Sequence, residues 1–306
     1  MKIEVAGVRL LHFDDGTPVR AASAIAPLGE GFVIAQDDAT HAGWWKESSI
    51  ERLRLFEPVE GLDAFSEAEG TKHLKPDLEA ACEVVVSGAP GVVLLGSGSS
   101  PARMRGALVV ISDGEVQVRA RDLTPLYEAV AAELGIELAQ LNLEGSCRAG
   151  SRVRLFNRGN LRAGLDSASV DVGLASLVAA MTGAGDVGAV PVDRPIRYDL
   201  GAVDGVGLAV TDAVALPDGR LLLSAAAEDT PNAIDDGPVV AAALALVDGE
   251  DVVAVGLLPS DGDQAHKVEG LAVRRADQDG ASLVAVVDAD DHLTPSAALD
   301  LEVRWL

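Results

Sequence analysis

Short apolar runs separated by polar turns follow one another along most of the chain. In residues 208–257, two pairs of such runs flank the turns 217–219 and 248–251. Runs of this length around Gly- and Asp-containing turns are typical of antiparallel hairpins, so this segment predicts a four-stranded sheet. Two further runs, on either side of residues 112–115, predict an equivalent outer hairpin elsewhere in the chain.

Five copies of this pattern can be recognised. Each begins with a polar anchor residue, usually acidic and usually followed by a small residue, and continues into an apolar stretch, a turn and a second apolar run. The anchors are 56 to 68 residues apart; they are Ser23, Glu79, Glu144, Asp212 and Glu269. Repeated four-stranded units are the signature of a β-propeller. The sequence therefore predicts an all-β, five-bladed β-propeller, with six blades as the alternative.

The two ends of the chain are predicted to close the ring of blades. Residues 298–305 alternate between apolar and polar, residues 2–11 read as a strand, and the last repeat has room for only three strands of its own. Pairing the two end segments in one blade would leave no free edge. We therefore expect a single propeller domain over residues 1–306.

One short inserted helix is predicted near residues 124–135. Thr124 and Pro125 supply start signals, Leu126, Val130 and Leu134 follow at helical spacing, and Gly135 ends the pattern. This helix is expected to decorate the join between the second and third blades.

Composition and charge exclude two classes of partner. The 24 Lys and Arg residues against 48 Asp and Glu give a formal charge of −24, which repels nucleic-acid phosphates and anionic lipid. The longest apolar runs are shorter than the roughly 20 residues that a membrane helix needs, and the N-terminus lacks a signal-peptide pattern. We expect a cytoplasmic protein with a small-molecule partner, whose oligomeric state is open. Cys82 and Cys147 lack disulfide or zinc spacing and are expected in the core.

In a propeller the first strand of each blade lines the axis, and its start lies on the same face as the end of the second strand. This geometry predicts a strongly acidic ring at one mouth of the channel, made by Glu79, Glu144, Asp212 and Glu269 together with Ser23. Converging carboxylates suit a divalent metal, with Ca²⁺ preferred over Mg²⁺ and Mn²⁺ because it takes more oxygen ligands. Ion pairing by Lys75, Lys267 and Arg158 is the alternative way to neutralise the ring.

Four of the five histidines are expected on the same face: His41, His73, His266 and His292. A histidine beside carboxylates can move protons near neutral pH. We therefore name His73, His266 and Glu144 as catalytic candidates. The alternative is that these histidines only reflect the polarity of loops.

The predicted mouth also supplies candidates for substrate binding. Trp44 follows His41 in what we expect to be a mouth loop, where it could form a pocket wall. A Gly- and Ser-rich segment at 96–105 offers hydroxyl groups and arginines that could hold an anion. The full set of substrate-binding candidates is Asp38, His41, Trp44, Ser99, Arg103, Arg158, Asp288 and His292.

The repeated Glu-Gly or Glu-Ala at the head of the inner strand, with Leu-Pro-Asp-Gly-Arg-Leu-Leu-Leu-Ser at 216–224, resembles a loose group of β-propellers. This group includes the phytase-like esterases and the gluconolactonase/regucalcin type. The resemblance implies a divalent metal at the axial mouth, held by Glu79, Glu144, Asp212 and Glu269, and hydrolysis of esters, lactones or phosphoesters. Two features depart from the group, which usually has six blades and an acid where this chain has Ser23.

Three functions therefore compete. The first is a metal-dependent hydrolase of a small ester, lactone or phosphoester at the mouth. The second is a non-catalytic binding or scaffold propeller, and the third a non-hydrolytic cyclase or isomerase that uses the mouth carboxylates as acids. A ring closed by Lys75, Lys267 or Arg158 would favour the second over the first.

Overall fold

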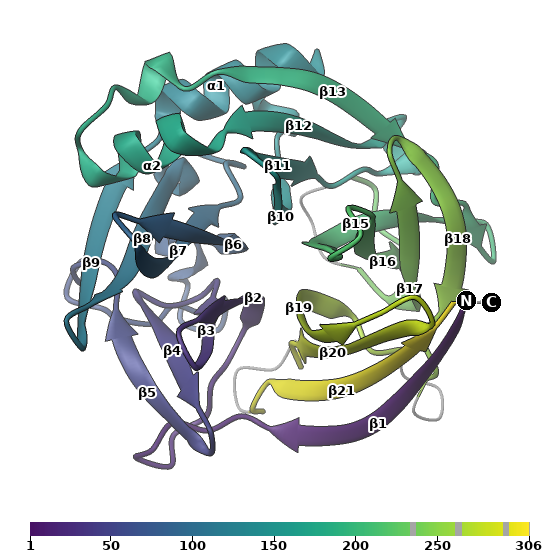
Figure 1. Cartoon of the computed structure of the whole chain (residues 1–306), viewed down its shortest axis with the longest axis horizontal. Coiled ribbons are helices and arrows are strands. Elements are labelled where there is room, and N and C mark those ends of the chain that lie inside the picture. Colours follow the sequence, from purple (N-terminus) through teal and green to yellow (C-terminus); the bar gives the residue numbers. More distant parts are fainter. Residues whose placement is uncertain (233–236, 261–264, 290–293, 306) are drawn as a thin grey trace.

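The computed structural model describes residues 1–232, 237–260, 265–289 and 294–305. Five antiparallel sheets stand around a central axis as the blades of a propeller (Figure 1). The predicted five-bladed fold is therefore confirmed, and the six-bladed alternative is excluded.

We name the blades A to E in chain order. Blade A comprises β2 (Ala22–Leu28), β3 (Gly31–Gln36), β4 (His41–Lys46) and β5 (Ser49–Arg54). Blade B comprises β6 (Leu78–Val86), β7 (Ala89–Gly96), β8 (Arg105–Ser112) and β9 (Glu115–Asp122). Blade C comprises β10 (Leu143–Ala149), β11 (Arg152–Asn157), β12 (Ser167–Gly173) and β13 (Val192–Tyr198). Blade D comprises β14 (Ala202–Val203), β15 (Val206–Ala215), β16 (Leu221–Glu228), β17 (Val239–Asp248) and β18 (Asp251–Leu257). Blade E comprises β19 (Val268–Ala276), β20 (Gly280–Val287), β21 (Ala297–Arg304) and β1 (Lys2–Leu10).

The inner strands β2, β6, β10, β15 and β19 form the wall of the axis, and each contacts the inner strands of both neighbouring blades. Apolar side chains fill the space between adjacent sheets. Leu95 and Leu108 of blade B, for example, share one core with Val153 and Leu155 of blade C. Because successive side chains of a strand point to opposite faces, the central strand β16 buries Leu222 in the core shared with blade E and Leu223 in the core shared with blade C.

The chain closes its own ring in blade E. Strand β1 pairs antiparallel with β21 from Lys2 opposite Arg304 to Leu10 opposite Ala297, with one bulge between Val5 and Gly7. Figure 1 shows the two termini side by side at the edge of the molecule. The predicted closure by the terminal strands is confirmed.

Two helices decorate blades B and C. Helix α1 (Thr124–Leu134) ends at Gly135 in the left-handed conformation, as predicted. Helix α2 (Leu174–Thr182) was not predicted, because its apolar run resembles that of a buried strand. It buries Leu177, Ala180 and Met181 in the same core as α1. Single turns of 3-10 helix lie at η1 (Lys72–Leu74), η2 (Pro101–Arg103), η3 (Leu138–Gln140), η4 (Leu161–Ala163) and η5 (Val187–Ala189).

One predicted loop is a strand. His41 and Trp44 lie in β4, the third strand of blade A, and not in a mouth loop. Residues of this segment pair with both β3 and β5, and Trp44 is half-buried under the Lys46 ammonium group, 3.9 Å from its ring centre. In the described part of the chain, no helix has the length and apolar character needed to cross a membrane.

Candidate site at the polar mouth of the axis

Each inner strand carries a register shift at the same point, and these five shifts define the ring at the mouth. The residues left unpaired in the bulges are Ser23, Glu79, Glu144, Thr211 and Glu269. A bulge turns its residue out of the regular alternation, so that it can face the axis. Two hydroxyls of the ring bridge to the next blade: Ser23 donates to the carbonyl of Leu78 and Thr211 to that of Val268, at 2.5 and 2.6 Å.

Thr211 thus takes the ring position that we predicted for Asp212. The sequence carries a signal for this register, because an apolar residue directly precedes four of the ring residues, as Val210 precedes Thr211. Asp212 is 2 % exposed and lies one step deeper, where its Oδ2 accepts a hydrogen bond of 2.7 Å from the backbone N–H of Leu271. Burial raises its pKa well above the ordinary value, against nearby backbone N–H groups. Asp212 therefore links β15 to β19 from a buried position.

The mouth encloses a cavity of about 90 Å³ that is polar on nearly all sides. Its charged lining residues are Asp37, Lys72, Lys75, Asp77, Glu79, Arg103, Glu144, Arg158, Lys267, Glu269 and Asp288. Acids and bases alternate, so the mouth is not the strongly acidic ring that we predicted. Three ring acids remain, and the basic side chains that precede or face them balance much of their charge.

On the side of blades A and B, Lys75 is the centre of an ion-pair cluster. Its ammonium group contacts Asp37 and lies 2.6 Å from Asp77, whose other oxygen is 2.9 Å from Arg103. Burial disfavours charge on Lys75, but the two carboxylates outweigh it and raise its pKa. Asp77 holds a left-handed backbone conformation, φ 57°, which the ion pairs and a hydrogen bond from Ser97 stabilise.

On the side of blades C, D and E, five side chains form one chain of alternating charge. Arg158 lies 2.9 Å from Glu144 and 2.8 Å from Glu228. Lys267 lies 2.7 Å from Glu228 and 2.9 Å from Glu269. The chain Glu144–Arg158–Glu228–Lys267–Glu269 therefore ties three blades together across the mouth.

Glu79 differs from the other ring acids. Within the described ranges it has no ion-pair or hydrogen-bond partner, although it lines the cavity and is half-buried. Burial and then the charges of Asp37 and Asp77 raise its pKa well above the ordinary value. Burial also raises the pKa of Asp37, but the Lys75 ammonium contacts Asp37 and favours its charged form. The pairing with Lys75 therefore favours the charged form of Asp37, whereas the surroundings of Glu79 favour its protonated form.

The cluster of blades A and B also contains the ligand types of a metal site. Asp37, Asp77 and Glu79 offer oxygens within 4.8 Å of one another, and such a triad could hold a metal ion. However, the Lys75 ammonium contacts two of the three carboxylates and occupies the place of a cation. These residues therefore do not fit a divalent ion as they stand, because the ion would have to displace Lys75.

Some predicted residues meet at the mouth and others do not. Those that line it are Glu79, Glu144, Glu269, Arg103, Arg158 and Asp288, and Ser99 is attached to it through a 2.8 Å hydrogen bond from Arg103. His73 is exposed on η1, and His266 is half-buried; neither lines the cavity. Asp38 pairs with Arg20 at 3.5 Å beside the mouth. His292 lies outside the described residues.

His41 and Trp44 contribute to blade A and not to the cavity lining. His41 packs against Phe13, with ring centres 5.6 Å apart, and burial with the charge of Arg52 lowers its pKa to about 4. It is therefore neutral near pH 7. Asp37, Asp77 and Glu228 are not among the site residues that we named from the sequence. The sequence does place Asp37 and Glu228 at the mouth, because they follow or end second strands, whereas Asp77 was missed.

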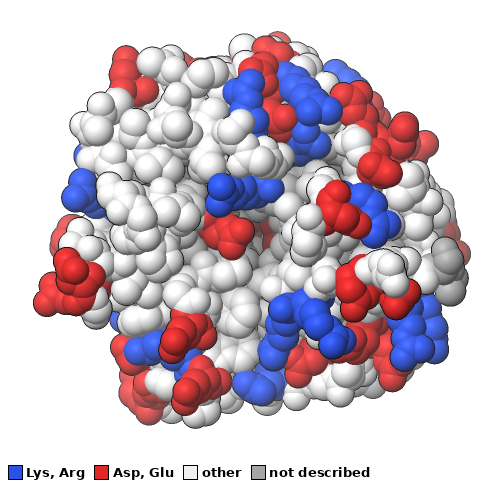
Figure 2. Space-filling view, viewed as in Figure 1, with Lys and Arg blue, Asp and Glu red and all other residues white. Residues whose placement is uncertain are grey.

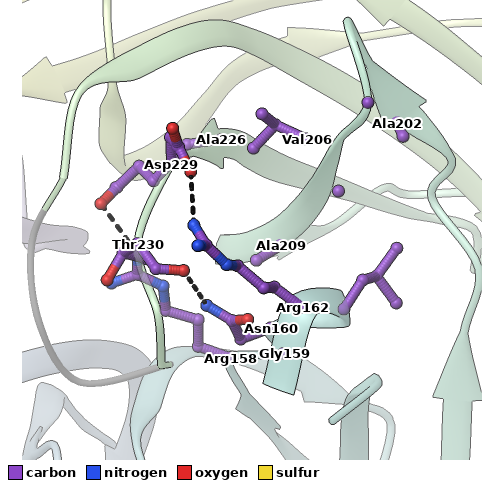
Figure 3. A pocket seen from close by; sticks show the side chains of 14 residues that line it. Arg158, Gly159, Asn160, Arg162, Ala202, Val206, Ala209, Ala226, Asp229 and Thr230 are labelled. Atoms are coloured by element: carbon purple, nitrogen blue, oxygen red, sulfur yellow. Dashed lines mark hydrogen bonds and ion pairs between the residues drawn. The ribbon is translucent and has the colours of Figure 1, made fainter. Parts of the chain in front are cut away.

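A second pocket of about 430 Å³ lies beside the mouth, between blades C and D, and Arg158 lines both (Figure 3). Figure 3 shows Arg162 directed at Asp229, 3.0 Å away, and Asn160 directed at the carbonyl of Thr230, 3.2 Å away. These contacts join the end of β11 to the end of β16. These polar groups of the pocket are thus paired with one another. We therefore place the candidate site at the mouth.

Comparison with known proteins gives a family and a set of distant structures. The model of a family of unknown function, DUF6910, matches residues 71–292. No curated protein matches the chain.

Three of the matching structures span nearly the whole chain. A protein of unknown function from Dyadobacter fermentans is 12% identical, with a TM-score of 0.45 and 99% of each chain covered. A luciferin-regenerating enzyme is 9% identical, with a TM-score of 0.39, covering 95% of this chain and 80% of that one. A candidate gluconolactonase, a class that the sequence resembles, is 12% identical, with a TM-score of 0.37, covering 90% and 71%. With TM-scores below 0.5, these likenesses carry no argument about the function of this chain.

Proposed function

The chain belongs to the DUF6910 family, a family of unknown function, and we propose from the mouth itself that it hydrolyses a small ester or lactone by carboxyl acid–base chemistry. One observation carries the proposal: Glu79 lines the cavity without an ion-pair or hydrogen-bond partner among the described residues, beside the paired groups Asp37 and Lys75, and burial raises its pKa. Neighbouring carboxyls whose environments favour different protonation states are a recurrent arrangement in acid–base sites.

The residues of the mouth supply both proton transfers that ester hydrolysis needs. A water attacks the carbonyl carbon while its proton passes to the Asp37 carboxylate. The bond between the carbonyl carbon and the leaving oxygen breaks, and the proton of Glu79 passes to that oxygen, so that an acid and an alcohol form. The cavity of about 90 Å³ admits only the reacting end of a substrate. The rest of the substrate would lie outside the mouth.

The test is hydrolysis of a panel of small esters and lactones by the wild type and by Glu79→Gln. Because positioned general acids contribute about 10²- to 10⁴-fold, we expect kcat to fall at least about 100-fold with a smaller change in KM. Glu83→Gln, on the exposed far end of the same strand, is the matched control and should retain full activity. No hydrolysis by the wild type, or equal rates for wild type and Glu79→Gln, would refute the proposal. Turnover without incorporation of solvent oxygen would instead indicate an isomerase or cyclase.

The arrangement of Lys75 also predicts the response to metals. Wild-type activity and the melting temperature should be unchanged by EDTA and by Ca²⁺, Mg²⁺ or Mn²⁺, since Lys75 already neutralises Asp37 and Asp77. In Lys75→Met the three carboxylates lose this cation, so millimolar Ca²⁺ should raise the melting temperature by mass action. Lys46→Met, at an exposed surface pair, is the control. A stoichiometric metal in the purified wild type would contradict this expectation and favour the metal-dependent route.

A second function, ligand binding without catalysis, is favoured by the closure of the ring. Lys75, Lys267 and Arg158 each contact two carboxylates, which is the arrangement that we expected of a scaffold propeller. A mouth of this kind would recognise a small polar molecule through groups that stay charged throughout. Saturable binding of a panel compound that remains chemically unchanged, and that still binds Glu79→Gln, would support this function over the hydrolase.

A further inference from the structure

A different cavity lies around the same axis, lined by the later halves of the inner strands. It measures about 460 Å³ and receives residues from all five blades. They are Ile25, Ala26 and Pro27 from blade A; Ala81, Cys82 and Glu83 from B; Ser146, Cys147, Arg148 and Gly150 from C; Ala213 to Pro217 from D; and Leu271, Ala272 and Val273 from E. We call this cavity the funnel.

The funnel is not a continuation of the mouth. Between the two cavities the inner strands approach so closely that a Cβ atom on Gly145 would lie 2.8 Å from the Cα of Asp212. A Cβ atom on Gly270 would likewise lie 2.8 Å from the Cα of Ala24. These contacts pack neighbouring inner strands tightly against each other, and the two cavities have no lining residue in common.

The lining of the funnel is mainly aliphatic, and its charged members are exposed. Glu83 and Arg148 are both exposed, whereas the remaining residues are buried or half-buried, apart from the loop positions Gly150 and Pro217. In the view along the axis, Figure 2 shows most charged side chains towards the periphery and uncharged side chains around much of the centre. A volume of this size falls within the range of small-molecule sites, roughly 300–1,000 Å³.

One polar group of the funnel has no partner. Ser146 is 2 % exposed, and within the described residues its hydroxyl makes no hydrogen bond. Buried hydroxyls are nearly always satisfied, since an unmade hydrogen bond costs about 1–3 kcal/mol. The other buried polar lining groups are the thiols of Cys82 and Cys147, which burial keeps protonated by raising the pKa of Cys82 to about 12 and that of Cys147 well above its ordinary value. The two thiols therefore add only weakly polar surface to the lining of the funnel.

We propose that the funnel binds a small uncharged molecule with an apolar body and one carbonyl-type oxygen, which accepts the hydrogen bond of the Ser146 hydroxyl. The aliphatic walls stabilise the apolar body, and the oxygen satisfies the buried Ser146 hydroxyl, which is unpaired among the described residues. A charged ligand is disfavoured, because the buried part of the funnel offers no opposite charge. This site is independent of the chemistry proposed for the mouth.

The test uses an uncharged fluorescent ketone, 6-propionyl-2-(dimethylamino)naphthalene, titrated with the native protein. We expect one saturable site with blue-shifted emission. Ser146→Ala should weaken binding about 3- to 10-fold, the value of one neutral hydrogen bond. Ala215→Phe, which fills the half-buried wall of β15, should abolish binding. Val253→Phe adds the same ring to the exposed strand β18 and should bind like the wild type.

Absence of saturable binding would overturn the proposal. Equal affinity in Ser146→Ala would overturn the assigned hydrogen bond, and equal affinity in a folded Ala215→Phe would overturn the location.

Discussion

Two carboxyls near the mouth show how surroundings set the behaviour of one residue type. Asp38 follows β3, and burial together with the charge of Asp37 raises its pKa to about 7. Asp63 lies on the surface, where hydrogen bonds from Arg54 and Thr40 lower its pKa to about 2. The same side chain is therefore partly protonated in one place and fully ionised in the other at neutral pH.

These shifts predict opposite pH effects on stability. Folded Asp38 binds a proton that the unfolded chain releases above pH 3.8, so its contribution to the free energy of unfolding is lost as the pH rises from about 4 to 7. The contribution of Asp63 is present above pH 3.8 and lost as the pH falls towards 2. Urea unfolding at several pH values should therefore show wild type losing stability relative to Asp38→Asn as the pH rises. Relative to Asp63→Asn, the wild type should gain stability as the pH rises from about 2 to 3.8. If each variant instead follows the pH profile of the wild type, both assignments are contradicted.

At the scale of the strand, the bulge repeated in each inner strand is what builds the site. It turns one residue per blade towards the axis, and the residue type decides what that blade contributes. Glu79, Glu144 and Glu269 supply carboxyls, whereas Ser23 and Thr211 supply latches to the next blade. The site therefore arises from five equivalent β-bulges, one in each inner strand.

The latch at Thr211 can be measured. Thr211→Val removes the 2.6 Å hydrogen bond to the carbonyl of Val268 and the 2.9 Å contact with the Ser224 hydroxyl. We expect the free energy of unfolding in urea to fall by about 1–3 kcal/mol. Thr211→Ser keeps the hydroxyl and should lose clearly less. A loss in Thr211→Val no larger than that in Thr211→Ser would contradict a stabilising role of the latch.

The strands, the blade count and helix α1 could be predicted because alternation and turn residues are local signals. The shift from Asp212 to Thr211 could not be read from acidity, because blade D places a hydroxyl and not an acid at its ring position; only the preceding apolar residue, Val210, marks that position. The pairing of Lys75 with Asp37 joins two blades, and Arg158 with Glu228 joins two others, so no local spacing reports them. Helix α2 was missed because a short run of Leu, Ala and Val fits strand and helix alike.

For the whole molecule, closure of the ring depends on blade E, in which β1 completes a sheet of three C-terminal strands. Ile3 is 7 % exposed and packs with Leu299, Leu301 and Val303 in one core. Val8 lies on the same strand but is 61 % exposed. Variants of these two residues therefore distinguish the effect of losing a buried side chain in blade E from the effect of any change in β1.

Ile3→Ala should lower the free energy of unfolding by about 2–5 kcal/mol, as expected for a truncation in a packed core. Val8→Ala should change it by no more than about 0.5 kcal/mol, because its side chain is in water. Thermal or urea unfolding of the two variants gives the comparison directly. A small effect of Ile3→Ala would mean that the closing blade contributes little to the stability of the ring.

The pairing of β1 with β21 also fixes an order of events during synthesis. Residues 2–10 leave the ribosome before any of their partners, and the strand that completes their hydrogen bonding, residues 297–304, is made after the strands of blades A to D. Until then β1 is an unprotected edge, and the contact that it awaits spans almost the whole chain. Contacts of such sequence separation form slowly. Until β21 is made, the nascent chain therefore depends on blades A to D to hold the ring nearly closed, so that β1 and β21 can pair.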